Sequence, residues 1–578
     1  MSELSSLIFP RNVYASLLEW ETGLAGQLHY GFFEHAAEPF LQAQERAVEL
    51  LLAYLPAEGS ILEVGCGFGG LTALLAASGR QVTGINVDAA QLAMARMRHG
   101  NDLSFRCTPF ESFHEQEGAW DIILFHESAQ YISMLDLLER TDALLKEHGE
   151  LLILDEWALR RVVSGKEGLH LKQHFIDLAG RFGFTCALNL DLSAGAVPAI
   201  DFLTEALLKH RDRLGALPGV TPAAIDRLIV ANRQYQDHYK TGRFGYALLH
   251  FTRTQRPGWR VGRIRPAHGQ AVQRLFCEVF GLPLTPEHWH WKYGDGRGAA
   301  VGVWKDGELV AHYGGLPRRI NYFGRREQAM QSVDAMVASK ARGAFTRKGA
   351  FFLATATHFE QYMGYGTPHL IGYGFPNQRA LQLPLKLGLY VTPIAHINEL
   401  VWEPSTVRNM FWYQLRELQG NNHADHHAID LLWHEMEAES EDLIIGVRDA
   451  AYWIHRYMQH PCIGYRNIMV YHRFLRRPCA VFACRQDGDR LELLDWVSRR
   501  TYLPGVIEAA RMTAYQTGSR ELYCWASEPL QEVVVAQVPP LRIVDTGIEV
   551  PTNGWTAGPA IAEIAGRIWL TGGDTDFK

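Results

Sequence analysis

An acidic residue and three spaced glycines stand together in the string LEVGCGFGG, from Leu62 to Gly70. The glycines let the backbone turn tightly and approach a ligand without a Cβ clash. The N–H groups of a helix that starts there point at the same ligand. Such a loop alone does not indicate which nucleotide cofactor is bound, but the acid two residues before the first glycine reduces the number of candidate cofactors. The candidate cofactor-binding residues of this string are Glu63, Gly65, Cys66, Gly67 and Gly69.

This string resembles motif I of the class I S-adenosylmethionine (SAM)-dependent methyltransferases. The resemblance implies that Glu63 supports the glycine loop and the methionine end of SAM, whereas NAD-binding proteins usually have an apolar residue there. The next strand ends in GINVDAAQ, with Asn86 where most members have an acid for the ribose hydroxyls, and with Asp88 and Gln91 close behind. The GIN form and Gln91 are similar to the small-molecule branch that includes cyclopropane-fatty-acid synthases and glycine-betaine-type N-methyltransferases.

Other parts of the same resemblance surround the expected cofactor. The adenine region falls on CTPFESF, where the family often has Asp and this chain has Thr108, Pro109 and Phe110. Upstream, LHYGFFE is similar to the N-terminal cap of the branch, so His29 and Tyr30 are expected to touch SAM or the acceptor.

The string FHESAQYI follows the fourth expected strand, where related enzymes line the mouth of the methyl-transfer site. Displacement at a sulfonium needs alignment, an unprotonated nucleophile and a dry pocket. A base is optional for an amine acceptor and needed for most hydroxyls. The candidates for orienting or deprotonating the acceptor are His126, Glu127 and Tyr131, with a purely structural role for His126 an equal alternative.

A second Gly/Arg turn follows a strand-like segment at VDAMVASKARGAF, and backbone amides at such a turn can cradle a pyrophosphate. The segment resembles the acyl-coenzyme-A loop of GNAT acetyltransferases, and GFPN further on is similar to a later GNAT strand and helix. Leu385 stands where many of these enzymes have a tyrosine acid, so a GNAT-shaped module without catalysis is the alternative. The candidate acyl-CoA residues are Val337, Lys340, Arg342, Gly343, Ala344, Phe345 and Asn377.

The elements that must hold these loops follow from hydrophobic patterning. From Ser60 onward, short apolar strands alternate with helices, which predicts a parallel, doubly wound, Rossmann-like sheet. Residues 160 to 235 are predicted mainly helical, and YKTGRFGYALLHFTRT is predicted to close the sheet. A Pro/Gly break then begins an α+β pattern. The predicted fold class is α/β, with a Rossmann-like methyltransferase domain at 1–254 followed by GNAT-like α+β domains at 260–420 and 427–578, the last degenerate.

Composition narrows the partners. The chain has 578 residues and a formal charge of -7, with Lys and Arg scattered, so a nucleic-acid partner is not expected. Eight cysteines without a CxxC pair predict neither disulfides nor a zinc site, and the His-rich string HADHHAIDLLWHE is interpreted as a linker entering a helix. No metal is predicted. Without a signal peptide or a long apolar run, the protein is expected to be soluble and cytoplasmic, with no membrane partner.

The leading hypothesis is a bifunctional enzyme of specialised metabolism. It methylates an amine or hydroxyl of a small molecule with SAM and acylates the same or a related molecule with an acyl-CoA. The first alternative is a methyltransferase with a non-catalytic GNAT-shaped module. The second is an aminoacyl-tRNA-dependent transferase, which the absence of a basic stripe disfavours. The sequence does not predict the oligomeric state.

Overall fold

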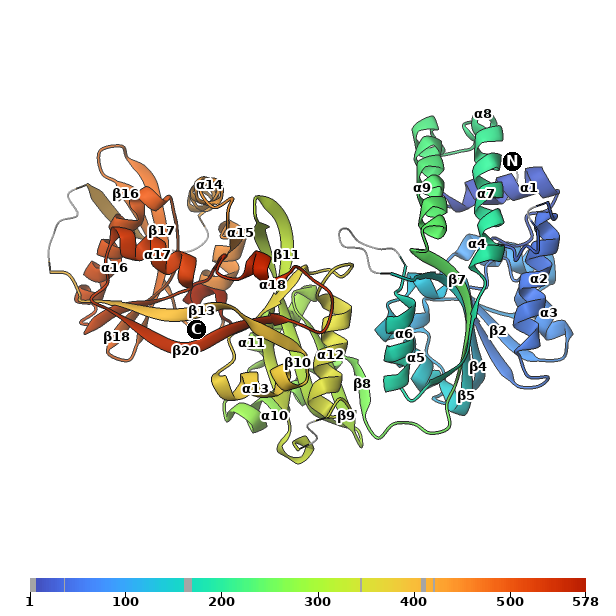
Figure 1. The fold of residues 1–578 in the computed structure, drawn as a ribbon, viewed down its shortest axis with the longest axis horizontal. Helices are drawn as coiled ribbons and strands as arrows, with labels where there is room; N and C mark the ends of the chain where they lie inside the picture. The colour runs from blue at the N-terminus through green and yellow to red at the C-terminus, as the bar shows by residue number, and fades with distance from the viewer. Residues whose placement is uncertain are drawn as a thin grey trace. The chain divides into compact units, whose positions relative to one another are not determined.

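The computed structural model describes residues 7–35, 37–160, 169–343, 346–406, 412–418 and 422–577. The predicted acyl-CoA residues Ala344 and Phe345 lie outside these ranges. The chain folds into two compact units. The described residues up to Gly262 form the first unit, and those from Arg263 onward form the second. Each unit is described separately (Figure 1).

A seven-stranded sheet forms the centre of the first unit, in the order β3-β2-β1-β4-β5-β7-β6. Strands β1 to β5 pair in parallel, as predicted, while β7 runs antiparallel to both of its neighbours. The strands are β1 Ser60–Val64, β2 Gln81–Asn86, β3 Ser104–Cys107, β4 Trp120–His126, β5 Leu145–Ala158, β6 Thr185–Asp191 and β7 Phe244–Thr252.

The strand predicted to close the sheet is present, but it does not form the edge of the sheet. Strand β7 lies between β5 and β6, and β6 forms the edge. The segment 160–235 is mainly helical among its described residues, but TCALNLD within it forms β6, whose side chains alternate between exposed and half-buried. This two-residue period is the signal of an edge strand, and the prediction of helix missed it.

Helices cover both faces of this sheet: α2 and α3 lie on one side and α5 and α6 on the other (Figure 1). Asp88 caps α4 by accepting from the N–H groups of Ala90 and Gln91, which fixes the end of the loop after β2. The helices are α1 Arg11–Thr22, α2 Phe40–Ala53, α3 Gly70–Ala77, α4 Ala89–His99, α5 Met134–Leu144, α6 Lys172–Arg181, α7 Ser193–Lys209, α8 Arg211–Leu214 and α9 Pro222–Lys240.

Strand order reverses between β1 and β4, because the chain runs outward to β3 on one side and to β5 on the other. In open α/β sheets this switch point leaves a crevice at the carboxyl ends of the strands. The glycine loop follows β1, and His126 is the last residue of β4. The sheet therefore brings the predicted cofactor loop and the predicted acceptor-side residues together.

The second unit contains two sheets. One has the path β12-β11-β10-β15-β21, with β9 also on β10 and β8 on β9, and the other has the order β14-β16-β17-β18-β19-β13-β20. Its strands are β8 Arg260–Arg263, β9 Ala299–Lys305, β10 Glu308–Tyr322, β11 Arg325–Val337, β12 Ile371–Tyr373, β13 Tyr390–Trp402, β14 Tyr413–Glu417, β15 Ile444–Gly446, β16 Arg466–His472, β17 Arg477–Asp487, β18 Arg490–Ser498, β19 Glu521–Ala526, β20 Arg542–Asn553 and β21 Ile568–Trp569. Its helices are α10 Gly269–Phe280, α11 Pro286–Tyr293, α12 Ala350–Tyr362, α13 Gln378–Lys386, α14 His423–Ala438, α15 Ala450–Trp453, α16 Leu503–Gln516, α17 Glu528–Gln537 and α18 Ile561–Ile564.

These two sheets exchange strands across the predicted domain boundary between residues 420 and 427. Strand β13 precedes the boundary but pairs with β19 and β20, and Figure 1 shows β13 and β20 running side by side. Strands β15 and β21 follow the boundary but extend the sheet of β10. The two sheets therefore share one core, in which Ile397 and Tyr523 pack with Ile320 and Tyr373. The three-domain division itself stays a prediction.

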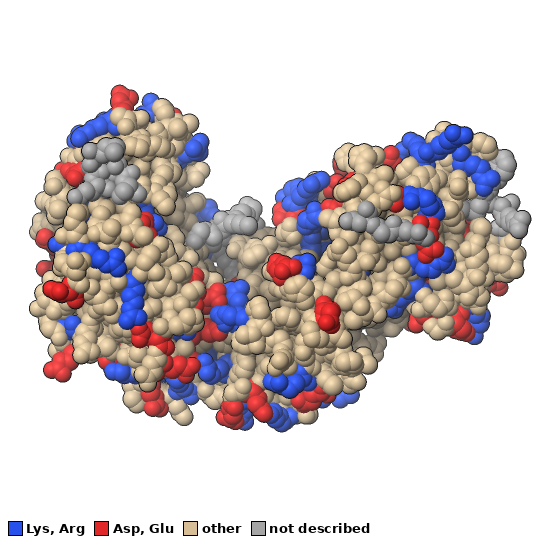
Figure 2. All heavy atoms as spheres, turned by 180° about the vertical axis from the view of Figure 1, so that it is seen from behind, with Lys and Arg blue, Asp and Glu red and all other residues tan. Residues whose placement is uncertain are grey.

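No helix in the described ranges is both long and apolar enough to cross a membrane. On the face drawn in Figure 2, Lys and Arg side chains lie interspersed with Asp and Glu.

Candidate functional site

A cavity of about 850 Å³ opens at the switch point of the first unit. Its walls come from the loops after β1, β2, β3 and β4, from the segment before α2, and from α1, α7 and α9. Of the residues predicted for the methyltransferase half, those that line it are Glu63, Gly65, Cys66, Gly67, Asn86, Gln91, Thr108, Pro109, Phe110, His126, Glu127 and Tyr131. His29 and Tyr30 also line it.

The three glycines of the loop share a backbone requirement but differ in what surrounds them. All three residues have left-handed backbones, with φ of +78° at Gly65, +54° at Gly67 and +77° at Gly69. A Cβ at Gly65 would lie 2.4 Å from the Cβ of Ser128, and one at Gly69 would lie 2.6 Å from the ring of Phe105. A Cβ at Gly67 meets no protein atom within 4 Å. Gly67 thus leaves space in the cavity, whereas Gly65 and Gly69 permit close packing of the loop.

Glu63 is a buried carboxyl at the floor of the cavity, with 3% of its surface exposed. Burial raises its pKa to about 7, although the hydroxyl of Thr72 donates a hydrogen bond to Oε2 and opposes the rise. A carboxyl in this state gains most from a ligand that brings a positive charge.

The residues predicted for the ribose divide into two roles. The Nδ2 of Asn86 donates to Oε1 of Gln91 over 2.7 Å, and both residues line the cavity. Asp88 is not among the lining residues: it caps α4 and pairs with Arg11, whose Nη1 lies 3.0 Å from Oδ2. Asp88 therefore stabilises the loop after β2, whereas Asn86 and Gln91 remain available to a ligand in the cavity.

At the predicted adenine region the backbone matters as much as the side chains. The N–H of Thr108 donates to the carbonyl of Asn86 over 2.9 Å, which joins the loops after β2 and β3. Phe110 is 2% exposed and packs edge-on against Phe125, with ring centroids 5.3 Å apart. This corner offers an apolar wall suited to a flat ring.

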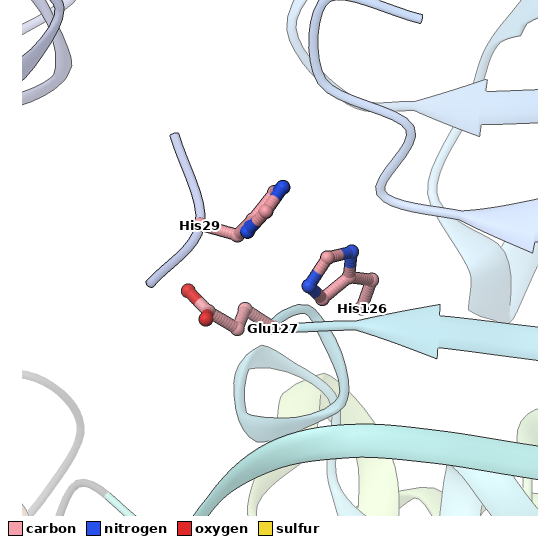
Figure 3. A group of neighbouring side chains, drawn as sticks. All are labelled: His29, His126 and Glu127. Carbon is pink, nitrogen blue, oxygen red and sulfur yellow. The ribbon is translucent and has the colours of Figure 1, made fainter. Parts of the chain in front are cut away.

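The cavity lining includes His29, His126 and Glu127, whose side chains surround one small space (Figure 3). The rings of His29 and His126 have centroids 4.0 Å apart. Glu127 Oε1 accepts from the N–H of Tyr30 over 2.7 Å and from the hydroxyl of Tyr246 over 2.6 Å. The Nε2 atom of His126 is buried and has no hydrogen-bond partner among the described residues.

Burial dominates the ionisation of these groups. It lowers the pKa of His29 to about 4 and that of His126 well below its usual value, so both rings are uncharged at neutral pH. Burial also raises the pKa of Glu127 well above its usual value, because the hydrogen bond from Tyr246 only partly offsets the lost solvation. Tyr131 differs from the others: its side chain is 76% exposed at the mouth of the cavity.

The sequence analysis did not single out two adjacent acids, Asp155 and Glu156, near the end of β5. Burial raises their pKa values to about 7 and about 8. Asp155 Oδ2 accepts from the N–H of Ala129 over 2.8 Å and so holds the turn after His126, while Glu156 lines the cavity. The signal was available, because the string LILDEW places two acids directly after buried strand residues in the sheet that forms the site.

The predicted acyl-CoA residues lie in the second unit, around the turn between β11 and α12. Lys340 is exposed and pairs with Glu308, and the Nε of Arg342 donates to the carbonyl of Val337 over 3.0 Å. Gly343 has φ +104° and open space around its Cβ position. Asn377 caps α13, accepting from the N–H of Ala380 over 2.8 Å. None of these five residues lines the 790 Å³ cavity of this unit, which lies beside β10 and α14.

Comparison with known proteins bears on the first unit. Residues 61–149, from β1 into β5, match the family model of a methyltransferase domain, so this segment is identified as one. A search of curated protein sequences gives no match.

Solved structures that resemble the chain include the [4+2]-cyclase SpnF, which is 23% identical over 42% of this chain and 94% of its own, with a TM-score of 0.37. The cyclopropane synthase MmaA2 from Mycobacterium tuberculosis is 17% identical over 39% and 90%, with a TM-score of 0.36. A conserved protein from Enterococcus faecalis V583, titled a probable N-acyltransferase, is 11% identical over 51% and 71%, with a TM-score of 0.39.

Proposed function

We propose that the first unit transfers the methyl group of SAM to a small molecule. The observation that carries this proposal is the 850 Å³ cavity, whose lining includes both the glycine loop and the side chains of His126 and Glu127. A methyltransferase must hold the donor sulfonium and the acceptor atom in line within one water-excluding space. The match of residues 61–149 to a methyltransferase domain supports the same reaction class.

Each predicted donor contact has a side chain of suitable chemistry. The Glu63 carboxyl, with its pKa of about 7, can ionise when the ammonium group of SAM arrives. The amides of Asn86 and Gln91 can hydrogen-bond the ribose hydroxyls, and Phe110 offers its ring to the adenine.

The acceptor end combines two uncharged imidazoles with a carboxyl. The unpaired Nε2 of His126 can accept a hydrogen bond from a hydroxyl or amine and so orient its lone pair. Glu127 has a raised pKa, which makes its ionised form a stronger base than an exposed carboxylate. We assign the acceptor-facing roles to these two residues, with Tyr131 at the mouth of the cavity.

The donor half is tested by a pair of glycine variants that differ only in location. Gly67→Ala fills space in the cavity, whereas Gly79→Ala stands at a turn after α3; both have positive φ and no atom within 4 Å of the added Cβ. Both variants therefore carry similar backbone strain. Calorimetric titration with SAM should show at least a tenfold loss of affinity in Gly67→Ala and no change in Gly79→Ala. Equal affinities in the two variants would refute the placement of SAM.

The acceptor is identified by mass. Purified protein is incubated with a metabolite extract and SAM that carries a trideuterated methyl group. A labelled product should appear with the wild-type chain and Gly79→Ala but be strongly reduced with Gly67→Ala. A product whose mass includes the label identifies the acceptor, and absence of label despite SAM binding contradicts methyl transfer to a small molecule of that extract.

Acyl transfer by the second unit is a second candidate, favoured by one feature of its sheet. Strands β11 and β12 pair in parallel only from Ala329 to Gln331, while β11 continues to Val337 with β10 as its neighbour on the other edge. The turn with Gly343 and helix α12 follow at once. Backbone N–H groups released between separating strands and at a helix start are suited to the pyrophosphate of an acyl-CoA.

This candidate is tested by titration with acetyl-CoA. Gly343→Leu should abolish the binding signal, whereas Gly488→Leu, in the hairpin between β17 and β18, should retain it. Both positions have positive φ and open surroundings. If the wild-type chain gives no response to acetyl-CoA or longer acyl-CoAs, the non-catalytic module becomes the better description, and the methyltransferase proposal is unaffected.

A further inference from the structure

The site contains a set of side chains that methyl transfer alone does not require. In the described part of the chain, His29, His126 and Glu127 form the one group of His, Cys, Asp or Glu residues placed to share an ion. One ligand atom from each lies within 4.8 Å of the other two. Figure 3 shows the three side chains around a common space, with His29 coming from the segment before α2 and the other two from the end of β4.

The backbone at Glu127 makes this convergence possible. His126 ends β4, and successive side chains on a strand point to opposite faces of the sheet. Glu127, however, has a left-handed backbone with φ of +53°, which is rare for a residue other than glycine. The turn directs the side chains of two consecutive residues into one cavity. Strained backbones of this kind persist where the surrounding structure fixes them, as at ligand sites.

Hydrogen bonds already orient two of the three groups. The Nδ1 of His29 lies 2.7 Å from the carbonyl oxygen of Tyr30; in the neutral tautomer in which this nitrogen donates, Nε2 carries the lone pair. Glu127 Oε1 is held by Tyr30 and Tyr246, which leaves Oε2. Histidine ligands of metals are typically fixed in this way, through a ring N–H donated to a backbone carbonyl.

The remaining atoms are the Nε2 of each histidine and Oε2 of Glu127. The Nε2 of His126 is buried without a described partner. The Nε2 of His29 contacts Oε1 of Gln27, a neutral side chain that also lines the cavity. An amide oxygen accepts, so a lone pair on Nε2 requires that this amide turn away from the ring. An ion between the three residues gives a partner to the imidazole nitrogen that lacks one and replaces the amide at the other.

We propose that His29, His126 and Glu127 bind a divalent transition-metal ion through His29 Nε2, His126 Nε2 and a Glu127 oxygen. Two imidazoles and one carboxylate suit Zn²⁺, Fe²⁺, Mn²⁺ or Co²⁺ and leave coordination positions open. Bonds of about 2.0–2.2 Å draw the three ligand atoms closer together than they are without the ion, by side-chain rotation. In a role that rests on the proposed methyl transfer, the open positions take an oxygen of the acceptor and hold it in the cavity.

The proposal is tested on tag-free, full-length protein that has been treated with a chelator and dialysed. Calorimetric titration with Zn²⁺ should give one ion per chain, and Co²⁺ should give a visible d–d absorption band. His126→Ala should lose both signals, with affinity reduced at least a hundredfold. The matched control is His148→Ala, because His148 is an exposed histidine of β5 in the same unit. It should bind one ion like the wild type.

A second variant guards against loss of folding. Glu127→Gln keeps the size of the side chain and removes its charge, so its metal affinity should fall at least tenfold while its circular dichroism stays that of the wild type. Binding of the same stoichiometry to His126→Ala and the wild type would overturn the site, as would absence of any Zn²⁺ or Co²⁺ binding to the wild type.

Titration of SAM into each protein separates this proposal from the proposed function. SAM binding to the wild type without metal binding removes only the metal site. Metal binding that disappears in His126→Ala supports the site even if SAM does not bind, and failure of SAM binding removes methyl transfer alone.

Discussion

The carboxyl groups of the first unit's cavity and those in the interior of the second unit have opposite surroundings. In the first unit Glu63, Glu127 and Glu156 line the cavity, and none of them forms an ion pair with a described Lys or Arg. Burial raises the pKa of each, so their surroundings offer hydrogen bonds but no countercharge. Buried acids of this kind are costly unless a ligand compensates them.

In the second unit, Lys and Arg side chains pair with buried acids. Lys292 Nζ lies 2.8 Å from Asp334 and 2.7 Å from Asp576. Arg448, whose side chain is fully buried, lies 2.7 Å from both Asp495 and Asp574. Burial alone would raise the pKa of Asp574, but Arg448 and Arg318 outweigh it and the net shift is downward. The contrast indicates that paired acids hold the second unit together, whereas the unpaired acids of the first unit await a cationic ligand.

The largest effect should come from breaking a paired acid. Arg448→Met leaves Asp495 without its guanidinium and Asp574 with only Arg318, so the free energy of unfolding should fall by about 3–5 kcal/mol. Thermal unfolding measures the loss, and hydrogen exchange resolved by peptide should place it in β18 and residues 570–577. SAM affinity should not change. A loss below about 1 kcal/mol would mean that these pairs do not hold the unit together.

Neutralising an unpaired acid should raise the free energy of unfolding instead of lowering it. The folded-state pKa of Glu63 is about 7, above its usual 4.5, so the unfolded chain releases this proton first. Ligand-free stability is then lost as pH rises from 4.5 to about 7. At pH 8, Glu63→Gln should gain about 1–3 kcal/mol, because the neutral amide avoids the buried charge but needs hydrogen bonds of its own. At pH 4.5 the gain should vanish; a destabilised variant at pH 8 would contradict the comparison.

Cofactor affinity should report the same carboxyl. A cationic ligand favours ionised Glu63, so SAM affinity should decrease as pH falls below about 7, by up to about tenfold per pH unit. Calorimetry from pH 5.5 to 7 measures the slope. In Glu63→Gln the affinity should be lower and its dependence on pH nearly flat. A wild-type slope that persists in this variant would assign the titration to another group.

The smallest effect belongs to an exposed pair in the second unit. Arg466 and Glu417 lie 2.9 Å apart with roughly two fifths of each side chain exposed. Arg466→Met should change the free energy of unfolding by less than about 1 kcal/mol, because solvent screens such pairs. It is therefore the matched control for Arg448→Met, and a comparable loss in both variants would show that burial is not the deciding factor.

The sequence predicted best what depends on neighbouring residues. A buried strand, a glycine loop and a helix follow one another within the string LEVGCGFGG, so Glu63 and the glycines could be placed from local pattern alone. The meeting of His29 with His126 depends on where the segment before α2 crosses the sheet, for which no local pattern exists. The left-handed backbone of Glu127 likewise has no signal, since sequence marks such positions mainly by glycine.

Long-range pairing explains what was missed elsewhere. The insertion of β7 between β5 and β6, and the pairing of β13 with β19 and β20, join segments that are distant in the chain. Strand patterning indicates that such segments are extended, but it does not choose their partners.

The contact between Gly65 and Ser128 has a consequence for how the two ligands affect each other's binding. The hydroxyl of Ser128 donates to the carbonyl of Val64 over 2.5 Å, and no side chain fits between Ser128 and Gly65. The loop that we assign to the methyl donor and the turn that carries His126 and Glu127 therefore move as one piece. Thermodynamic linkage then requires reciprocity: whatever factor SAM applies to the affinity for the acceptor, the acceptor applies to the affinity for SAM.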